Sequence, residues 1–177
     1  MNEATRAAVL IPVCSVNGEP HLVFIRRSHG APVHGGDIAF PGGRYDSARD
    51  DSLLATALRE AEEEIGLRAT DVELLHALPE VRTLSSNFLI APFVGRIPHP
   101  YDFATDAREV AAVLTLSIGA LRAPAAHRRV PRRLTSGAAV EVDALVVGSI
   151  VIWGATYRIT TELFRAGTVF ARPLPDK

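Results

Sequence analysis

Arg59-Glu60-Ala61-Glu62-Glu63-Glu64-Ile65-Gly66-Leu67 is the stretch of sequence that decides the fold. Glu60 and Glu64 are four residues apart, so in a helix both side chains project from one face, with Glu63 beside them. Like charges at this spacing repel, and negative charge in the last turn opposes the helix macrodipole by about 0.3–1 kcal/mol per residue. Stability alone gives no reason for the cluster, which is either a solvated acidic face or a functional site.

The helix that carries these glutamates is predicted from its two ends. Asp50, Asp51 and Ser52 offer N-cap oxygens, and Gly66 provides a C-terminal stop. A helix from about residue 50 to Ile65 follows. Its apolar residues recur at helical spacing and are predicted to form the buried stripe: Leu54, Leu58, Ala61 and Ile65.

A glycine-rich stretch, Ser28–Gly43, precedes this helix and ends in Phe40-Pro41-Gly42-Gly43. Hard divalent cations such as Mg²⁺ bind carboxylate oxygens, which Glu60, Glu63 and Glu64 supply from one rigid element. A backbone carbonyl of the Gly42-Gly43 loop is a further ligand, because glycine permits close approach of the backbone. A helix that breaks local rules beside a glycine-rich loop therefore indicates a metal-dependent functional site.

The rest of the chain is rich in predicted strands. Asn17-Gly18 favours the positive φ angles of a tight hairpin turn, so the apolar segments on either side pair as antiparallel strands. Strands that outnumber helices and open with a hairpin predict a mixed sheet packed between helices. The segments predicted as strands are Ala7–Val16, His21–Ile25, Val72–Leu78, Phe88–Ile97, Glu109–Leu116 and Val140–Trp153.

The C-terminal part divides into an irregular segment and a closing helix. Arg122–Gly137 is the least regular segment of the sequence. Its basic cluster, His127–Arg133, is interpreted as a solvated loop rather than a nucleic-acid site, because no aromatic residues interleave with it. Gly154–Arg165 is predicted to be a helix, and the side chains expected to turn inward are Tyr157, Leu163 and Phe164.

The composition is that of an ordinary globular protein. The chain has 177 residues, of which 47% are hydrophobic and 22% charged, and its net charge is −1. That length fits one domain, residues 1–177, and the balanced charge gives no field for gripping nucleic acid or an anionic membrane. The single cysteine, Cys14, cannot form an internal disulfide, which favours a reducing compartment such as the cytoplasm. No H-E-x-x-H, G-x-S-x-G or C-x-x-C pattern occurs, which argues against zinc, serine-hydrolase and thiol chemistry.

The acidic segment resembles the Nudix hydrolase family, whose box runs G-x5-E-x7-R-E-U-x-E-E-x-G-U, where U is apolar. Arg59–Leu67 matches the second half of that box throughout. The first half departs from it, because seven residues separate Gly43 from Asp51 where the box has five before a glutamate. The resemblance implies an α/β (α+β) fold, an α/β/α sandwich with a mixed sheet, and hydrolysis of a nucleoside diphosphate derivative with Mg²⁺ or Mn²⁺.

A second motif, ahead of the box, is similar to that of the coenzyme A pyrophosphatase subgroup, L-L-T-x-R-S-x3-R-x3-G-x3-F-P-G-G. Val23–Ser28 aligns with its start, Gly36 with its glycine and Phe40–Gly43 with its end, all at the same spacing. Pro32 stands where the subgroup has its middle arginine, so one expected phosphate contact is missing. The resemblance implies cleavage of coenzyme A or its derivatives into 4′-phosphopantetheine, or its acyl form, and adenosine 3′,5′-bisphosphate.

The glutamate cluster supplies the first candidate site residues. Glu60 and Glu64 are the primary predicted metal ligands, followed by Glu63 and by the carbonyl of Gly43. Arg59 is expected to orient the glutamates through charge-assisted hydrogen bonds rather than to touch the substrate.

Residues outside the helix complete the candidate set. Glu109 follows a loop at the start of a strand, where it is predicted to act as general base or further metal ligand; a strand-edge solubility charge is an equal alternative. Arg26 and Arg27 precede the glycine-rich loop and are predicted to hold phosphate together with Gly42 and Gly43. Alternation along a strand indicates that one of the two arginines faces the site.

Three functions stay open at this point. The first is the coenzyme A pyrophosphatase described above, and the second is the same chemistry on ADP-ribose, NADH or another nucleoside diphosphate derivative. The third is a non-catalytic nucleotide-binding module, against which the intact Glu60, Glu63 and Glu64 argue. Each implies a small nucleoside diphosphate ligand and no nucleic-acid or membrane partner, and leaves a homodimer open.

Overall fold

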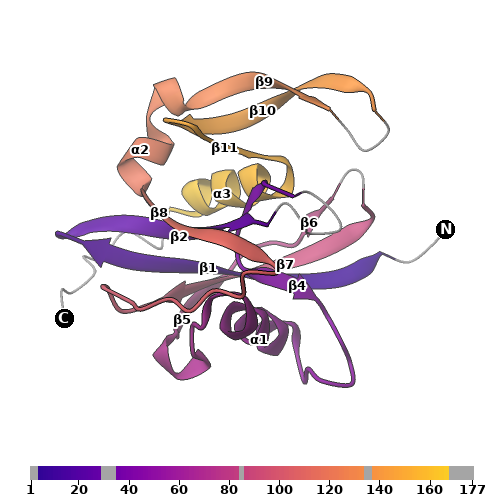
Figure 1. Ribbon diagram of the computed structural model, residues 1–177, viewed down its shortest axis with the longest axis vertical. Coiled ribbons are helices and arrows are strands. Elements are labelled where there is room, and N and C mark those ends of the chain that lie inside the picture. Colours follow the sequence, from indigo (N-terminus) through magenta and orange to yellow (C-terminus); the bar gives the residue numbers. More distant parts are fainter. Residues whose placement is uncertain (1–3, 29–34, 84–85, 134–136, 168–177) are drawn as a thin grey trace.

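The computed structural model describes residues 4–28, 35–83, 86–133 and 137–167, which form two β-sheets and three α-helices (Figure 1). Pro32, which stands in the place of an arginine in the subgroup motif, lies outside these residues. The central sheet consists of β1 (Thr5–Val16), β2 (Glu19–Arg27), β3 (Ile38–Ala39), β4 (Gly42–Arg44), β5 (Glu73–Ala77), β6 (Val81–Arg82), β7 (Phe88–Arg96) and β8 (Val110–Ser117).

The central sheet is mixed, as the sequence predicts. Its main path runs β3-β2-β1-β7-β5, while β4 pairs with β1, β6 with β7 and β8 with β2. β1 and β7 run parallel over nine residue pairs, from Thr5 opposite Phe88 to Val13 opposite Arg96. The other pairings in this sheet are antiparallel. The first hairpin turns at Asn17-Gly18, with φ of 52° and 78°, which confirms the predicted tight turn.

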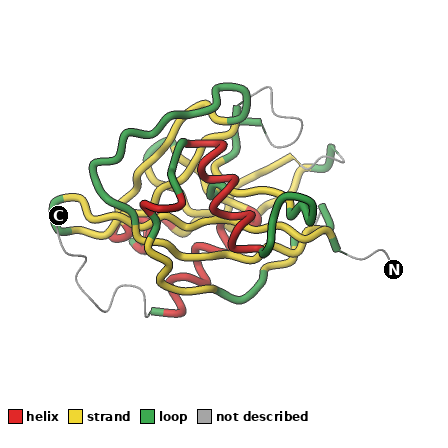
Figure 2. The backbone as a smooth tube through the Cα atoms, turned by 90° about the horizontal axis from the view of Figure 1, so that it is seen from below, coloured by secondary structure: helices red, strands yellow, loops and turns green. Residues whose placement is uncertain are grey.

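A second, three-stranded sheet and two of the helices cover one face of the central sheet, and α1 covers the other (Figure 1). Seen from below in Figure 2, a helix crosses the strands on the side where Figure 1 places α1. The second sheet was not foreseen as a separate layer. These elements are β9 (His127–Arg133), β10 (Ala139–Val147), β11 (Ile150–Trp153), α1 (Leu53–Ile65), α2 (Ile118–Arg122) and α3 (Gly154–Ala166), with short 3₁₀ turns at Ala69–Asp71 and Pro124–Ala126.

Alternation along β1 and β2 divides the apolar side chains between two cores. Leu10 and Val23 pack toward α1, whereas Ile11 and Phe24 pack toward α2, α3 and the second sheet. Burying each such side chain fully stabilises the fold by roughly 1.5–3 kcal/mol. Since both faces of the sheet are covered, the prediction of a mixed sheet packed between helices is confirmed.

The helix α1 begins and ends where its sequence signals predict, but its buried face is turned. The Oγ atom of Ser52 accepts a hydrogen bond from the Ala55 amide at 3.1 Å, and Gly66 ends the helix with φ of 67°. Leu54 and Leu58 are only half-buried, so the predicted stripe was wrong at these two positions. The prediction is confirmed at Ala61 and Ile65, which are buried. The helix also buries Thr56, Ala57 and Glu64, of which the two polar residues have hydrogen-bond partners inside.

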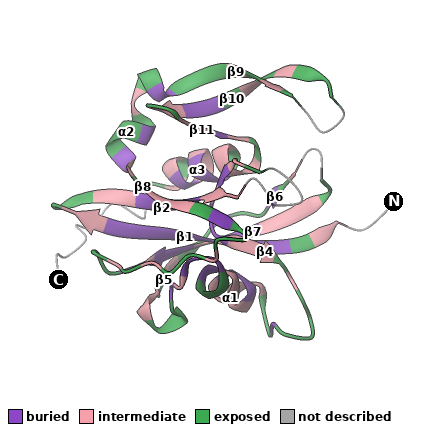
Figure 3. Cartoon of the chain, viewed as in Figure 1, coloured by how far each residue is buried: buried purple, intermediate pink, exposed green. Residues whose placement is uncertain are grey.

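The basic cluster His127–Arg133 is a strand, β9, and not a loop. It pairs along its length with β10, and its side chains are mostly exposed (Figure 3). The guanidinium of Arg132 lies over the Trp153 ring, 5.7 Å from its centroid, and the Trp153 Nε1–H donates to Asp37 Oδ1 at 3.0 Å. Arginines with local partners explain why a segment without apolar alternation still forms a strand.

The closing helix α3 is confirmed. Leu163 is fully buried, while Tyr157 and Phe164 are half-buried against the same core. In the part of the chain that the structure describes, none of the helices has the length and apolar character needed to cross a membrane.

Candidate active site

Arg59 is the centre of an ion-pair network at the middle of α1. Its Nε and Nη2 atoms donate to the two carboxylate oxygens of Asp50, at 2.7 and 3.0 Å. Its Nη1 atom lies 2.8 Å from Glu60 Oε1 and donates to Glu63 Oε2 at 2.9 Å. The hydrogen bonds that Arg59 donates to Asp50 raise the pKa of Arg59 further, so the guanidinium stays charged. Arg59 therefore contacts Asp50, Glu60 and Glu63, and its predicted role in orienting the glutamates stays a prediction.

The acid that anchors Arg59 is Asp50 and not Asp51, which the box alignment singles out. Asp50 is 4% exposed, while Asp51 is exposed to solvent. Besides the two bonds from Arg59, the Asp50 carboxylate accepts from Thr56 Oγ1 at 2.9 Å and from the Asp46 amide at 3.1 Å. These donors, Arg59 first, hold the pKa of Asp50 far below its usual range. The long loop after Gly43 thus brings Asp50 under the arginine.

Glu64 is a buried carboxylate facing the glycine loop. It is 2% exposed, and its Oε2 accepts a hydrogen bond from the Gly42 amide at 2.9 Å. Burial raises the pKa of Glu64 to about 8, and the charges of Glu60 and Glu109 raise it too. The Gly42 amide and the charge of Arg27 oppose this rise. A nearby cation would stabilise the charged form of this buried carboxylate, so Glu64 indicates a candidate cation site.

Glu60 lies against the backbone of Gly43. A Cβ atom on Gly43 would stand 2.4–2.7 Å from the carboxylate atoms of Glu60, so no side chain fits there. Burial raises the pKa of Glu60, Arg59 lowers it, and the charges of Glu63 and Glu109 raise it further. At Gly42, where φ is 156°, a Cβ would lie 2.4 Å from the Ala8 carbonyl oxygen. Gly43 is therefore required for the close approach of the loop to the Glu60 carboxylate, and Gly42 for its close approach to β1.

Glu63 faces a different set of partners. It forms ion pairs with Arg49 and Arg59, and the hydrogen bond from Arg49 is the main cause of its lowered pKa. Its side chain is 45% exposed. Of the three glutamates, Glu60 and Glu64 thus lie at the glycine loop, while Glu63 lies on the arginine side of the helix.

Glu109 and Arg27 reach the same carboxylates from the sheet. Glu109 stands in the turn before β8, where its carbonyl accepts from the Ser28 amide at 2.8 Å, and its charge acts on both Glu60 and Glu64. Arg27 lies on the same face of β2 as Val23 and Ile25, which pack toward α1, and its charge acts on Glu64. Arg26, the residue before it, is directed by alternation toward the opposite face. Arg27 is therefore the one of the two arginines whose charge reaches Glu64.

An open cavity adjoins this site beside Arg59 and Glu60. Its volume is about 490 Å³, which lies within the range of small-molecule sites, about 300–1,000 Å³. Arg44 and Arg49 had not been singled out from the sequence, although both follow the Gly42-Gly43 pair closely. The lining consists of Arg44, Tyr45, Asp46, Ser47, Arg49, Arg59 and Glu60.

The donor set suits a hard divalent cation. Two carboxylates with raised pKa values face the backbone of Gly42 and Gly43, which has room for no side chain. Oxygen ligands of this kind are those that Mg²⁺ and Mn²⁺ take. Within the described ranges, however, no three His, Cys, Asp or Glu side chains converge closely enough to hold a metal by themselves. The ligand set of Glu60, Glu63, Glu64 and Gly43 stays a prediction.

Comparison with known proteins now assigns the family. A family model described as the NUDIX domain matches residues 4–134, most of the chain. The chain belongs to the Nudix family. The predicted membership of the Nudix hydrolase family is thereby confirmed, and the acidic helix lies within the matched residues.

The similarity to known Nudix proteins is partial in sequence and extensive in fold. An uncharacterized Nudix hydrolase, NudL of Yersinia enterocolitica, is 42% identical over 112 residues, which are 63% of this chain and 56% of that protein. The match thus spans little more than half the length of that relative. A Nudix hydrolase from M. smegmatis, RenU, has a TM-score of 0.64 at 16% identity, covering 99% of this chain and 92% of that chain. The NUDIX domain of Shewanella oneidensis NrtR complexed with ADP ribose gives 0.51 at 15% identity, covering 67% and 76%. At these identities the two structures show the fold alone.

Proposed function

We propose that this Nudix protein hydrolyses the diphosphate linkage of coenzyme A or its derivatives, with Mg²⁺ or Mn²⁺. The observation that carries the chemistry is the pair of inward carboxylates, Glu60 and Glu64, held against Gly42 and Gly43. Water adds to one phosphorus while the bridging P–O bond breaks, which releases 4′-phosphopantetheine and adenosine 3′,5′-bisphosphate as two phosphate monoesters.

The chain's own residues have separate tasks in this proposal. Glu60, Glu64 and Glu63, with the Gly43 carbonyl, hold the metal, and Arg59 with Asp50 keeps the glutamates oriented. A divalent cation supplies charge neutralisation for the diphosphate and lowers the pKa of the attacking water. Glu109, whose charge reaches Glu60 and Glu64, is the proposed general base or further ligand.

Arginines support an anionic substrate at this site. Arg27 acts on Glu64 from β2, and Arg44 and Arg49 line the neighbouring cavity. Phosphoryl transfer depends mainly on positioning and on neutralising charge, which forked guanidinium groups do well. We propose coenzyme A rather than another diphosphate as the substrate because the Val23–Gly43 motif resembles that of the coenzyme A pyrophosphatase subgroup.

A second candidate is the same chemistry on ADP-ribose or NADH. The NrtR neighbour, complexed with ADP ribose, favours this alternative, since it shares the fold. A non-catalytic nucleotide-binding module is disfavoured by the intact carboxylates.

We further propose that residues 1–177 form a single Nudix domain. Leu145, Ile152, Ile159 and Leu163, beyond the matched residues, pack into the same core as β1 and β2. A cytoplasmic location and a homodimer stay predictions.

The deciding experiment compares kcat/KM for coenzyme A, dephospho-coenzyme A, ADP-ribose and NADH, with Mg²⁺ and with Mn²⁺. Losing one charged contact to the 3′-phosphate is worth about 1.5–3 kcal/mol, so we expect coenzyme A to exceed its dephospho form roughly ten- to a hundredfold. If ADP-ribose or NADH is cleaved tenfold better than coenzyme A, the second candidate replaces the first. Absence of metal-dependent cleavage of all four compounds would leave the binding module.

A further inference from the structure

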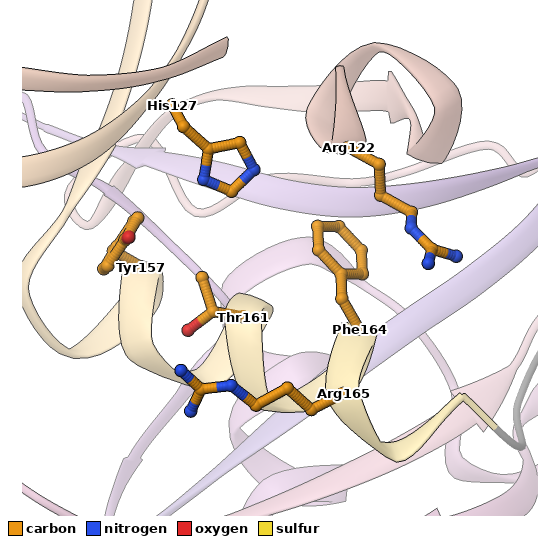
Figure 4. A pocket seen from close by; sticks show the side chains of 6 residues that line it. All are labelled: Arg122, His127, Tyr157, Thr161, Phe164 and Arg165. Atoms are coloured by element: carbon orange, nitrogen blue, oxygen red, sulfur yellow. The ribbon is translucent and has the colours of Figure 1, made fainter. Parts of the chain in front are cut away.

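A second cavity lies on the other side of the central sheet from α1, bordered by α2, the first residue of β9 and α3 (Figure 4). Its volume is about 350 Å³, large enough for a small molecule. Figure 4 shows His127 and Tyr157 on one side of it and Phe164 with Arg122 on the other. The complete lining is Arg122, His127, Tyr157, Thr161, Phe164 and Arg165.

Three polar groups line this cavity: the Arg122 guanidinium, the His127 ring and the Tyr157 hydroxyl. Among the described residues, neither a hydrogen bond nor an ion pair involves the Arg122 guanidinium, the His127 ring or the Tyr157 hydroxyl. The Arg122 guanidinium instead lies over the Phe164 ring, 5.6 Å from its centroid, which orients it while leaving its N–H groups free. Donors that line opposite sides of one cavity without partners among the described residues are suited to an external ligand that spans it.

The charge of the cavity is positive. Arg122 and Arg165 line it, and none of its lining residues is acidic. Arg165 is partly neutralised by Glu162, at 3.4 Å, whereas Arg122 has no carboxylate partner in the described ranges. Guanidinium forks match phosphate oxygens bidentately, and Tyr157 and Phe164 add aromatic surface against which a flat ring can pack.

We propose that this cavity binds a phosphate monoester attached to a flat ring, of the chemical class of a nucleoside monophosphate. The Arg122 guanidinium contacts the phosphate on one side of the cavity, and the ring reaches across to Tyr157 and His127, whose aromatic surface and polar groups contact it. The site is separate from the carboxylate site at α1 and does not depend on any hydrolysis there.

The test is an NMR titration of the ¹⁵N-labelled protein with AMP, adenosine and inorganic phosphate as separate probes. We expect AMP to shift the amides of His127, Tyr157 and Phe164, and to bind at least tenfold more tightly than adenosine or phosphate. Arg122→Gln is expected to weaken AMP binding roughly ten- to a hundredfold, because it removes a charged hydrogen-bond donor. Tyr157→Phe, which keeps the packing and deletes one hydroxyl, is expected to weaken binding about threefold or more.

Arg129→Gln is the matched control, because Arg129 is an exposed arginine of β9 that does not line the cavity. Its AMP affinity is expected to stay within about twofold of the parent. AMP shifts confined to amides around Glu60 and Glu64, no shifts at all, or undiminished binding in Arg122→Gln would each overturn the proposal. Equal affinity for AMP and adenosine would overturn the phosphate contact, and equal affinity for AMP and phosphate would overturn the ring contact. Turnover of diphosphates is measured separately, so failure here leaves the proposed function intact.

Discussion

The two faces of the central sheet carry opposite arrangements of charged side chains. On the α1 face, Arg59 forms short ion pairs with Asp50 and Glu63, and Glu64 accepts a hydrogen bond from a backbone amide. On the α3 face, Arg122 and His127 border an open cavity without a carboxylate among its lining residues. The first arrangement holds acidic groups rigidly inside the protein and suits a cation. The second presents donors to solvent and suits an anion.

This comparison predicts that substitutions of charged residues lower activity and stability most on the α1 face. The largest effect is expected for Glu64→Gln, which we predict keeps the fold but lowers metal-dependent turnover at least about 10³-fold, or ~4 kcal/mol in the barrier. The amide oxygen of glutamine still accepts from Gly42, and a buried carboxyl that is costly to ionise is gone, so the metal-free melting temperature should hold or rise slightly.

Kinetics and thermal melting of Glu64→Gln should be measured beside Glu62→Gln. Glu62 is exposed on the same helix, so its variant provides the same change of charge away from the glycine loop. A folded Glu64→Gln protein with wild-type turnover would remove Glu64 from the site.

The next largest effect concerns Glu109, at the edge of the α1 site. A positioned general base contributes typically 10²–10⁴-fold, so Glu109→Ala should lower kcat/KM by about that factor. Asp102→Ala, an exposed acid in the preceding loop, is the control. A loss below about threefold, on the order of 0.6 kcal/mol, would mean that Glu109 is a rim charge.

The two faces also differ in how far the sequence predicts them. Helix α1, its caps and its glutamates follow from a contiguous pattern, and the Asn17-Gly18 hairpin follows from its turn residues. The role of Asp50 does not follow from the pattern. Asp50 and Asp51 are adjacent carboxylates in the sequence, and only the path of the loop determines which of them accepts hydrogen bonds from Arg59. The cavity on the α3 face is assembled from residues far apart in the chain, such as Arg122 and Phe164, so no local pattern reveals it.

A third prediction measures the stability of the interlocked network. Asp50→Asn should lower the free energy of unfolding by about 3 kcal/mol at pH 7, because Arg59 loses a buried carboxylate that accepts two of its hydrogen bonds. Asp51→Asn changes the same charge at an exposed neighbour and should stay within about 0.5 kcal/mol of wild type. Urea unfolding measures both variants. Equal stabilities of the two variants would contradict the assignment of Asp50 as the anchor.

The smallest expected effect is the pH dependence of the difference in free energy of unfolding between wild type and Asp50→Asn. The pKa of Asp50 in the folded protein lies far below its usual value, so folding is stabilised by the charged carboxylate above about pH 4. As pH falls below 4, the unfolded chain takes up a proton that the folded chain still refuses, and wild type loses this stabilisation. Asp50→Asn cannot titrate there, so its stability gap to wild type should narrow by about 1 kcal/mol between pH 5 and pH 3. Asp51→Asn keeps the ion pair between Asp50 and Arg59 and serves as the control. Urea unfolding of all three proteins at pH 5, 4 and 3 checks this, and a gap for Asp50→Asn that stays constant or widens would contradict the ion pair with Arg59.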